Sequence, residues 1–232
     1  MATTRRELLV AGLGSTALLA CRHGAAKPGG EHEGGEEEEE VTPAEDLMRE
    51  HGVLRRVLLV LDEASRRLVA NEPLAPDALA SAARIVRTFV EDYHEQLEEQ
   101  HLFPRFEAAK QHVELVTILR TQHRAGRVLT DRILAGATAA GLGDAATKAS
   151  VLDAMHGFAR MYRPHAARED TVLFPALVTI IGEDEYEELG ERFEAEEHRR
   201  FGTRGFFGVV DEVAAIEATL GIADLAAFTP TM

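Results

Sequence analysis

Two stretches of the chain share one frame: HEQLEEQHLFP at residues 94–104 and HAAREDTVLFP at residues 165–175. Each places a glutamate four residues after a histidine, follows it with an acidic residue, and ends in Leu-Phe-Pro. Side chains four residues apart project from the same face of a helix. The repeat therefore predicts two helices that each present an imidazole and a carboxylate on one face and that each break near the proline.

A further histidine precedes each stretch at nearly the same distance. His51 lies 43 residues before His94, and His123 lies 42 residues before His165. This internal repeat indicates two helical hairpins with the same arrangement of polar residues. Two such half-sites facing each other would form a single metal site. Its predicted ligands are His51, His94, Glu98, His123, His165 and Glu169.

Apolar residues recur at helical spacing over four segments, the first from 43 onward and the others near 76–104, 109–136 and 146–173. Thr42 is a candidate N-cap for the first segment, and Pro43 suits its first turn. The sequence therefore predicts an all-α protein, an up-down-up-down four-helix bundle over 43–202. Additional helical segments, 183–201 and a C-terminal extension at 203–232, should cover the bundle.

The composition of the 232 residues limits the possible functions. The net charge of −15 argues against a nucleic-acid partner, which would require a basic face. Cys21 is the single cysteine, so an internal disulfide or a thiolate cluster cannot form, and a metal site must use imidazoles and carboxylates.

The N-terminus is typical of an export signal at residues 1–21. An arginine pair at 5–6 precedes an apolar run at 8–20, which is short for a membrane span. The pair resembles a twin-arginine signal, and LLAC at 18–21 resembles a lipoprotein cleavage box with Cys21 as the lipidated residue. We expect a protein anchored to the membrane through this lipid and exposed in the cell envelope. The alternative is a cytosolic helix with a chance arginine pair.

Residues 22–42 contain seven glutamates and two Gly-Gly pairs, a composition that cannot form a core. We expect an extended tether between the lipid anchor and the folded domain. His23 and His32 lie within it, so a metal-scavenging tail is the alternative.

Four imidazoles and two carboxylates suit iron, manganese or zinc. If Glu98 and Glu169 both bridge two six-coordinate ions, the side chains fill roughly eight of twelve positions. A solvent bridge would fill two more. About two positions would then remain for solvent, dioxygen or another protein ligand.

At these residues the chain resembles the hemerythrin-like family over roughly 43–202. The resemblance implies a four-helix bundle that holds two non-haem iron ions. Oxygen-carrying members of that family have a second histidine four residues further along the third helix, where this chain has Arg127. This departure argues against simple reversible oxygen carriage. Glu95, which directly follows His94, is a candidate replacement ligand, as an acid is in some regulatory relatives.

Other polar residues carry weaker signals. His101 lies two turns beyond His94 and is a candidate for a base behind the ligands or for an extra ligand, although a histidine near a helix end is commonly structural. Tyr162 lies on the inward stripe and could donate a hydrogen bond to a bound ligand, although packed core tyrosines are common. His112, His156 and His198 have no counterpart in the repeat and are expected to be surface or capping residues.

Three functions remain open from the sequence. The leading one is a di-iron protein of the cell envelope that binds or senses dioxygen, peroxide, nitric oxide or iron. The second is a di-iron oxidoreductase that turns over peroxide or nitric oxide, or a protein of iron storage and detoxification. A purely structural polar core is disfavoured, because burying these groups without a cation loses their hydration. The sequence identifies no protein partner.

Overall fold

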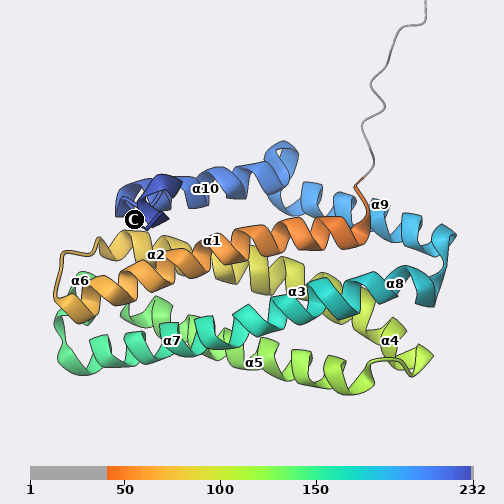
Figure 1. Ribbon diagram of the computed structural model, residues 1–232, viewed down its shortest axis with the longest axis horizontal. Coiled ribbons are helices and arrows are strands. Elements are labelled where there is room, and N and C mark those ends of the chain that lie inside the picture. Colours follow the sequence, from red (N-terminus) through yellow and green to blue (C-terminus); the bar gives the residue numbers. More distant parts are fainter. Residues whose placement is uncertain (1–40, 231–232) are drawn as a thin grey trace, which may run out of the picture. The chain divides into compact units, whose positions relative to one another are not determined.

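The computed structural model describes residues 41–230, and all regular structure in that range is helical, which confirms the predicted all-α class. Figure 1 shows long helical runs lying side by side, with α9 and α10 along one side of α1. Residues 1–40 lie outside the described residues. They include the predicted signal, Cys21 and most of the acidic tether.

Four helical runs form the bundle. The first is α1 (Pro43–Ala70) and the third is α5 (Val113–Gly136). The second run contains α2 (Pro76–Ile85), the π-helical segment η1 (Val86–His94), α3 (Glu95–Leu97), the π-helical segment η2 (Glu98–Leu102) and α4 (Phe103–Ala109). The fourth run contains α7 (Ala145–Arg168), the π-helical segment η3 (Glu169–Leu173) and α8 (Phe174–Ile181).

The remaining elements are α6 (Ala139–Gly143), α9 (Glu183–Phe201), η4 (Gly202–Arg204), α10 (Gly205–Leu220) and η5 (Leu225–Phe228). Within the bundle, α1 packs against α7 and α2, and α5 packs against the same two helices from the other side. Each run thus has two neighbours, as an up-down-up-down bundle requires. Apolar side chains from all four runs fill the interior.

The helix ends follow from local sequence signals. The Thr42 hydroxyl accepts a hydrogen bond from the backbone N–H of Glu45, and the Glu45 side chain accepts one from the backbone N–H of Thr42. This capping box confirms the predicted start of the first helix. Asp144 caps α7 in a similar way through the N–H of Thr147.

The prediction that helices break at the two Leu-Phe-Pro sequences is wrong. The second run continues through Pro104 to Ala109, and the fourth continues through Pro175 to Ile181. Each proline follows a π-helical segment and lies in the first turn of the next α-helix. The hydrogen-bond pattern changes from π-helical to α-helical at this point, so the run continues without the N–H that proline lacks.

The C-terminal helices pack on the bundle. Helix α9 contacts α1 and α8, and α10 contacts α1 and α2. Helix α10 buries Val209, Val213, Ile216 and Leu220, and its Glu217 forms an ion pair with Arg56 of α1 at 2.5 Å. Among the helices of residues 41–230, none has the length and apolar character needed to cross a membrane.

Candidate metal centre

The six predicted ligands all lie inside the bundle, and each is at most 3% exposed. His51 comes from α1, and His123 comes from α5. On the other two runs, the histidine precedes a π-helical segment and the glutamate is its first residue. His94 precedes η2, and Glu98 is the first residue of η2. In the same way, His165 precedes η3, and Glu169 is its first residue. π-Helical turns are often found at functional sites.

The imidazoles form two pairs that face each other through their Nε2 atoms. Nε2 of His51 lies 3.1 Å from Nε2 of His94, and Nε2 of His123 lies 3.2 Å from Nε2 of His165. Two nitrogens bound to one ion at about 2.1 Å and at right angles would lie about 3 Å apart. Each pair is therefore spaced to hold one metal ion.

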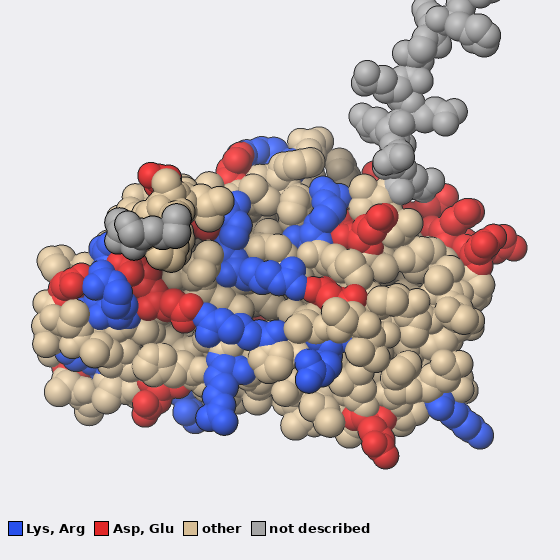
Figure 2. Space-filling model, in the orientation of Figure 1, with Lys and Arg blue, Asp and Glu red and all other residues tan. Residues whose placement is uncertain are grey.

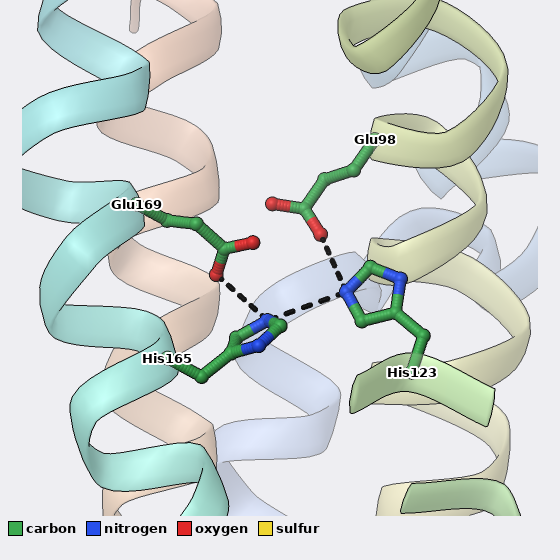
Figure 3. A group of neighbouring side chains, drawn as sticks. All are labelled: Glu98, His123, His165 and Glu169. Carbon is green, nitrogen blue, oxygen red and sulfur yellow. Dashed lines mark hydrogen bonds and ion pairs between the residues drawn. The ribbon is translucent and has the colours of Figure 1, made fainter. Parts of the chain in front are cut away.

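The carboxylates lie between the two imidazole pairs. Oε1 of Glu98 is 3.7 Å from Nε2 of His94, and Oε2 is 3.4 Å from Nε2 of His123. Oε2 of Glu169 is 3.4 Å from Nε2 of His51 and 3.0 Å from Nε2 of His165. Both glutamates thus face both pairs. Figure 3 shows the half with Glu98, His123, His165 and Glu169, whose side chains converge from three helical runs.

Each histidine is oriented by a hydrogen bond from its outer nitrogen, Nδ1. The Nδ1–H of His94 donates to Glu50 at 2.6 Å, and that of His165 donates to Gln122 at 2.9 Å. His51 donates to Asp170 at 2.6 Å, and His123 donates to Glu99 at 2.9 Å. In the neutral imidazoles, these bonds place the proton on Nδ1 and leave a lone pair on each inward-facing Nε2.

The atoms that face the middle of the centre can bind a cation, but they cannot form hydrogen bonds with one another. With the protons on Nδ1, four nitrogen lone pairs face four carboxylate oxygens. All four oxygens of Glu98 and Glu169 are buried and lack a hydrogen-bond partner among the described residues. Buried polar groups without partners cost free energy. Two metal ions held by these six side chains would satisfy all of them.

The pKa values show which groups of the centre favour a proton when no cation balances the charges. Burial alone would lower the pKa of His51, but its hydrogen bond with Asp170 and the neighbouring charge of Glu169 raise it to about 9. Burial, followed by the charge of Glu169, raises the pKa of Glu98 well above its usual range. Burial lowers the pKa of His123 to about 4. A cation bound at the centre would take the place of the protons that these shifts favour on His51 and Glu98.

The structure assigns Arg127 a role that the sequence did not predict. Its guanidinium lies 2.9 Å from Glu99, the partner of His123, and Arg55 pairs in the same way with Asp170, the partner of His51. Arg55 and Arg127 each lie four residues after the histidine of their half. Arg127 therefore stabilises an orienting carboxylate, as its repeat counterpart does.

Glu95 lies on the outer side of His123. Its Oε2 is 3.9 Å from Nδ1 of His123 and forms an ion pair with Arg127 at 2.7 Å, while its Oε1 accepts a hydrogen bond from the Tyr162 hydroxyl at 2.5 Å. The structure thus does not bring Glu95 to the inward-facing Nε2 atoms. The Tyr162 ring lies 5.2 Å from that of His165, which places Tyr162 beside the centre.

His101 is not brought to the centre. Its ring is partly buried and lies 6.0 Å from the ring of Phe193 on α9, and no described contact joins it to the four imidazoles. His112 lies in the turn before α5, in a left-handed conformation with φ of 50°.

The groups that orient the histidines were not predicted from the sequence. Glu50 and Gln122 each directly precede a histidine, whereas Glu99 and Asp170 each directly follow a glutamate of the centre. An acid or amide directly before the first histidine of each half, and an acid directly after its glutamate, was the signal that could have identified them. The paired arginines four residues after His51 and His123 were a second signal.

Residues 42–177 match the hemerythrin HHE cation binding domain, so the chain belongs to that family. The match covers the four runs of the bundle up to α8. The centre described above therefore lies within a cation-binding domain, and the family and the donor set together indicate a metal-binding protein, with iron the favoured metal.

The chain is also similar to uncharacterized proteins of Mycobacterium bovis and of two Mycobacterium tuberculosis strains, CDC 1551 and H37Rv. Each is 48% identical over 235 residues, which covers 99% of this chain and 92% of the relative. No solved structure was found to match the chain.

Gly126 provides a test of the packing around Tyr162. A Cβ atom at Gly126 would lie 2.1 Å from the Tyr162 hydroxyl, so Gly126→Ala must displace a buried ring. Overpacking of this kind costs about 1–3 kcal/mol. We expect a corresponding loss in the free energy of unfolding, measured with denaturant. In the control, Gly157→Ala, the new Cβ would meet Leu129 at an ordinary 3.6 Å. Equal stability of the two variants would contradict the described packing.

Proposed function

We propose that this protein is a non-haem di-iron protein that reacts with dioxygen or a related small oxidant and thereby serves as a sensor or redox protein. One observation carries the assignment of two ions: two imidazole pairs share two buried carboxylates whose oxygens have no other partner among the described residues. Iron bound there would supply reversible electron transfer and open positions for a small ligand. The donor set of imidazoles and carboxylates supports iron but also suits manganese or zinc.

The outer hydrogen bonds determine what the chain contributes to this chemistry. Each Nδ1–H bond holds its imidazole in one tautomer and one orientation, which keeps all four Nε2 atoms available to metal. The pairs of Arg55 with Asp170 and of Arg127 with Glu99 hold two of the accepting carboxylates in place. Tyr162 and Arg127 together hold Glu95 beside the centre, where its carboxylate can accept or return a proton.

A cavity between α1 and α7 is our candidate route for a small ligand. It has a volume of about 290 Å³ and is lined by apolar side chains, including Leu54, Leu58 and Ala166, together with Tyr162 and the arginines Arg55 and Arg163. Ala166 directly follows His165 and is the repeat counterpart of Glu95. Glu95 fills the space beside one half of the centre with a charged side chain. In the other half, the small side chain of Ala166 leaves the corresponding space open. An apolar cavity favours an uncharged small ligand such as dioxygen or nitric oxide.

Arg127 supports redox behaviour over reversible oxygen carriage. It occupies the position of the extra histidine in the oxygen-carrying pattern, and its guanidinium is held by Glu95 and Glu99. No described side chain replaces that nitrogen ligand, which leaves more of the coordination sphere open to oxidation.

Stopped-flow mixing of the reduced, iron-loaded protein with dioxygen tests this proposal. We expect oxidation that removal of dioxygen does not reverse. Ala166→Leu should slow the reaction about ten-fold or more by filling the cavity, whereas Ala146→Leu, at an exposed position on the same helix, should not. Full recovery of the reduced spectrum under vacuum would support oxygen carriage instead, and an unchanged rate in Ala166→Leu would reject this route.

We further propose export and lipid anchoring in the cell envelope. The support is the order of the arginine pair, the apolar run, Cys21 and the acidic tether, all in sequence outside the described residues. Cys21→Ser is expected to release the protein from the membrane fraction of cells, because a lipid on Cys21 is the proposed anchor. A native protein that retains Met1 and fractionates with the cytosol would refute the proposal.

A further inference from the structure

A second group of acidic side chains lies at the junction of α1, η1 and α9. Oxygen atoms of Asp46, Glu50 and Glu197 lie within 4.8 Å of one another. Glu50 is fully buried, whereas Asp46 and Glu197 are partly exposed, so the group extends from the surface towards the core. Figure 2 shows acidic side chains gathered on this part of the surface, over α9 beside the start of α1.

Two buried oxygen atoms in this group have no hydrogen-bond partner among the described residues. One is Oε1 of Glu50, whose other oxygen accepts the Nδ1–H of His94. The other is the hydroxyl of Tyr93, a residue with 0% exposure. The carboxylates of Glu50, Asp46 and Glu197 are the acidic neighbours of this hydroxyl.

Glu50 also differs from the other groups that orient the histidines. Glu99 is paired with Arg127, Asp170 is paired with Arg55, and Gln122 is uncharged. No described lysine or arginine forms an ion pair with Glu50. Arg49 forms its ion pair with Asp46, at 3.6 Å.

Among the described residues, Arg49 is the one arginine or lysine that pairs with a carboxylate of this group, so the three carboxylates exceed the positive charge beside them. A bound divalent ion would satisfy the same charges and would also provide a partner for the two orphaned oxygens.

We propose that Asp46, Glu50 and Glu197, with the hydroxyl of Tyr93, form a third cation site, separate from the two-ion centre. Its ligands are all oxygen atoms, which suit a hard divalent ion such as Mn²⁺ or Fe²⁺. Glu197 lies on α9, beyond residues 42–177 that match the family, so the site combines the family domain with the C-terminal segment of this chain.

The position of Glu50 gives the site a connection to the centre. One oxygen of Glu50 faces the acidic group, and the other holds His94, whose Nε2 faces the centre. A cation at the acidic group would therefore share Glu50 with a ligand of the centre. If the proposed di-iron function is correct, on which this step rests, the site lies on a path by which Fe²⁺ reaches the centre from the surface of α9.

Titration of the iron-loaded full-length protein with Mn²⁺, followed by the electron paramagnetic resonance signal of free Mn²⁺, tests for the site. We expect each chain to bind about one Mn²⁺ ion in addition to its iron. Glu197→Gln and Asp46→Asn should each weaken this binding at least about ten-fold, as the loss of a ligand should cost no less than the loss of a group that orients one. In Glu197→Gln the new amide oxygen can still accept the N–H of Phe206, so the fold is retained.

Glu188→Gln is the matched control, since it removes one charge from an exposed position on the same helix. It should leave Mn²⁺ binding unchanged. Absence of Mn²⁺ binding, or equal binding by Glu197→Gln and the unaltered protein, would overturn the third site. Mn²⁺ binding that is lost in His123→Ala and retained in Glu197→Gln would instead locate the ion in the two-ion centre. The same titration can be carried out on protein that takes up no iron. Failure of the third site can therefore be distinguished from failure of the proposed di-iron function.

Discussion

Replacing Glu98 with alanine should release both metal ions, whereas replacing His123 with alanine should mainly weaken one. The two oxygens of Glu98 face different imidazole pairs, one with His94 and one with His123. Loss of the carboxylate also leaves Glu169 as the only bridge. We expect each ion to bind more than about 100-fold more weakly, because loss of a group that merely orients a ligand already costs about 10–100-fold. Glu169→Ala should behave in the same way.

Iron content per chain and the absorption spectrum measure this effect. Glu217→Ala is the control, since Glu217 is also a buried glutamate but pairs with Arg56 on the far side of α1. We expect this variant to keep both ions, although its free energy of unfolding should be lower. If Glu98→Ala retained both ions and the original spectrum, Glu98 would not be a bridge. If His123→Ala released both ions as readily, the two ions would bind as one cooperative unit.

Removing the metal should lower the thermal stability substantially. An ion present at a thousand times its dissociation constant stabilises the folded state by about 4 kcal/mol. For a domain of this size, each kcal/mol changes Tm by about 2–4 °C. Loss of even one ion should therefore lower Tm by roughly 8–16 °C. The physical origin is the buried lone pairs of the centre, which in the metal-free protein must take up protons or remain unpaired.

Differential scanning calorimetry before and after reduction and chelation provides the measurement. Restoring ferrous iron should restore Tm, and the variant Glu98→Ala should respond to neither treatment. A Tm that is the same with and without chelator would mean that the six side chains are already satisfied without a cation. That result would favour a structural polar core.

The sequence was sufficient to predict the fold class and the inward residues. The spacing of His94 to Glu98 and of His165 to Glu169, found twice, required a helix that presents both side chains on one face. The earlier histidines of each half then defined the hairpins. These features are local and repeated, so they could be identified without knowledge of the tertiary structure.

The outer contacts were less predictable, because they depend on how the halves pack together. His51 donates to Asp170 of the other half, and His123 donates to Glu99 of the other half. The prolines were misinterpreted for a related reason. The π-helical segments before Pro104 and Pro175 change the hydrogen-bond pattern ahead of each proline, and residue spacing alone does not show such segments.

The contacts of Arg127 and Glu95 depend on how the helical runs pack together. The sequence showed a departure from the oxygen-carrying pattern and suggested Glu95 as a replacement. In the structure, Glu95 is held by Tyr162 and Arg127 on the outer side of His123. The orientation of Glu95 depends on these two residues from α7 and α5, which sequence spacing does not place beside it.

Metal analysis of the purified protein, joined to Mössbauer spectroscopy after loading with enriched iron, tests the central claim most directly. The account predicts two iron ions per chain with the magnetic coupling of a carboxylate-bridged pair, because both glutamates face both imidazole pairs. A chain that takes up no iron, or that holds one uncoupled ion under conditions in which the fold is intact, would contradict it.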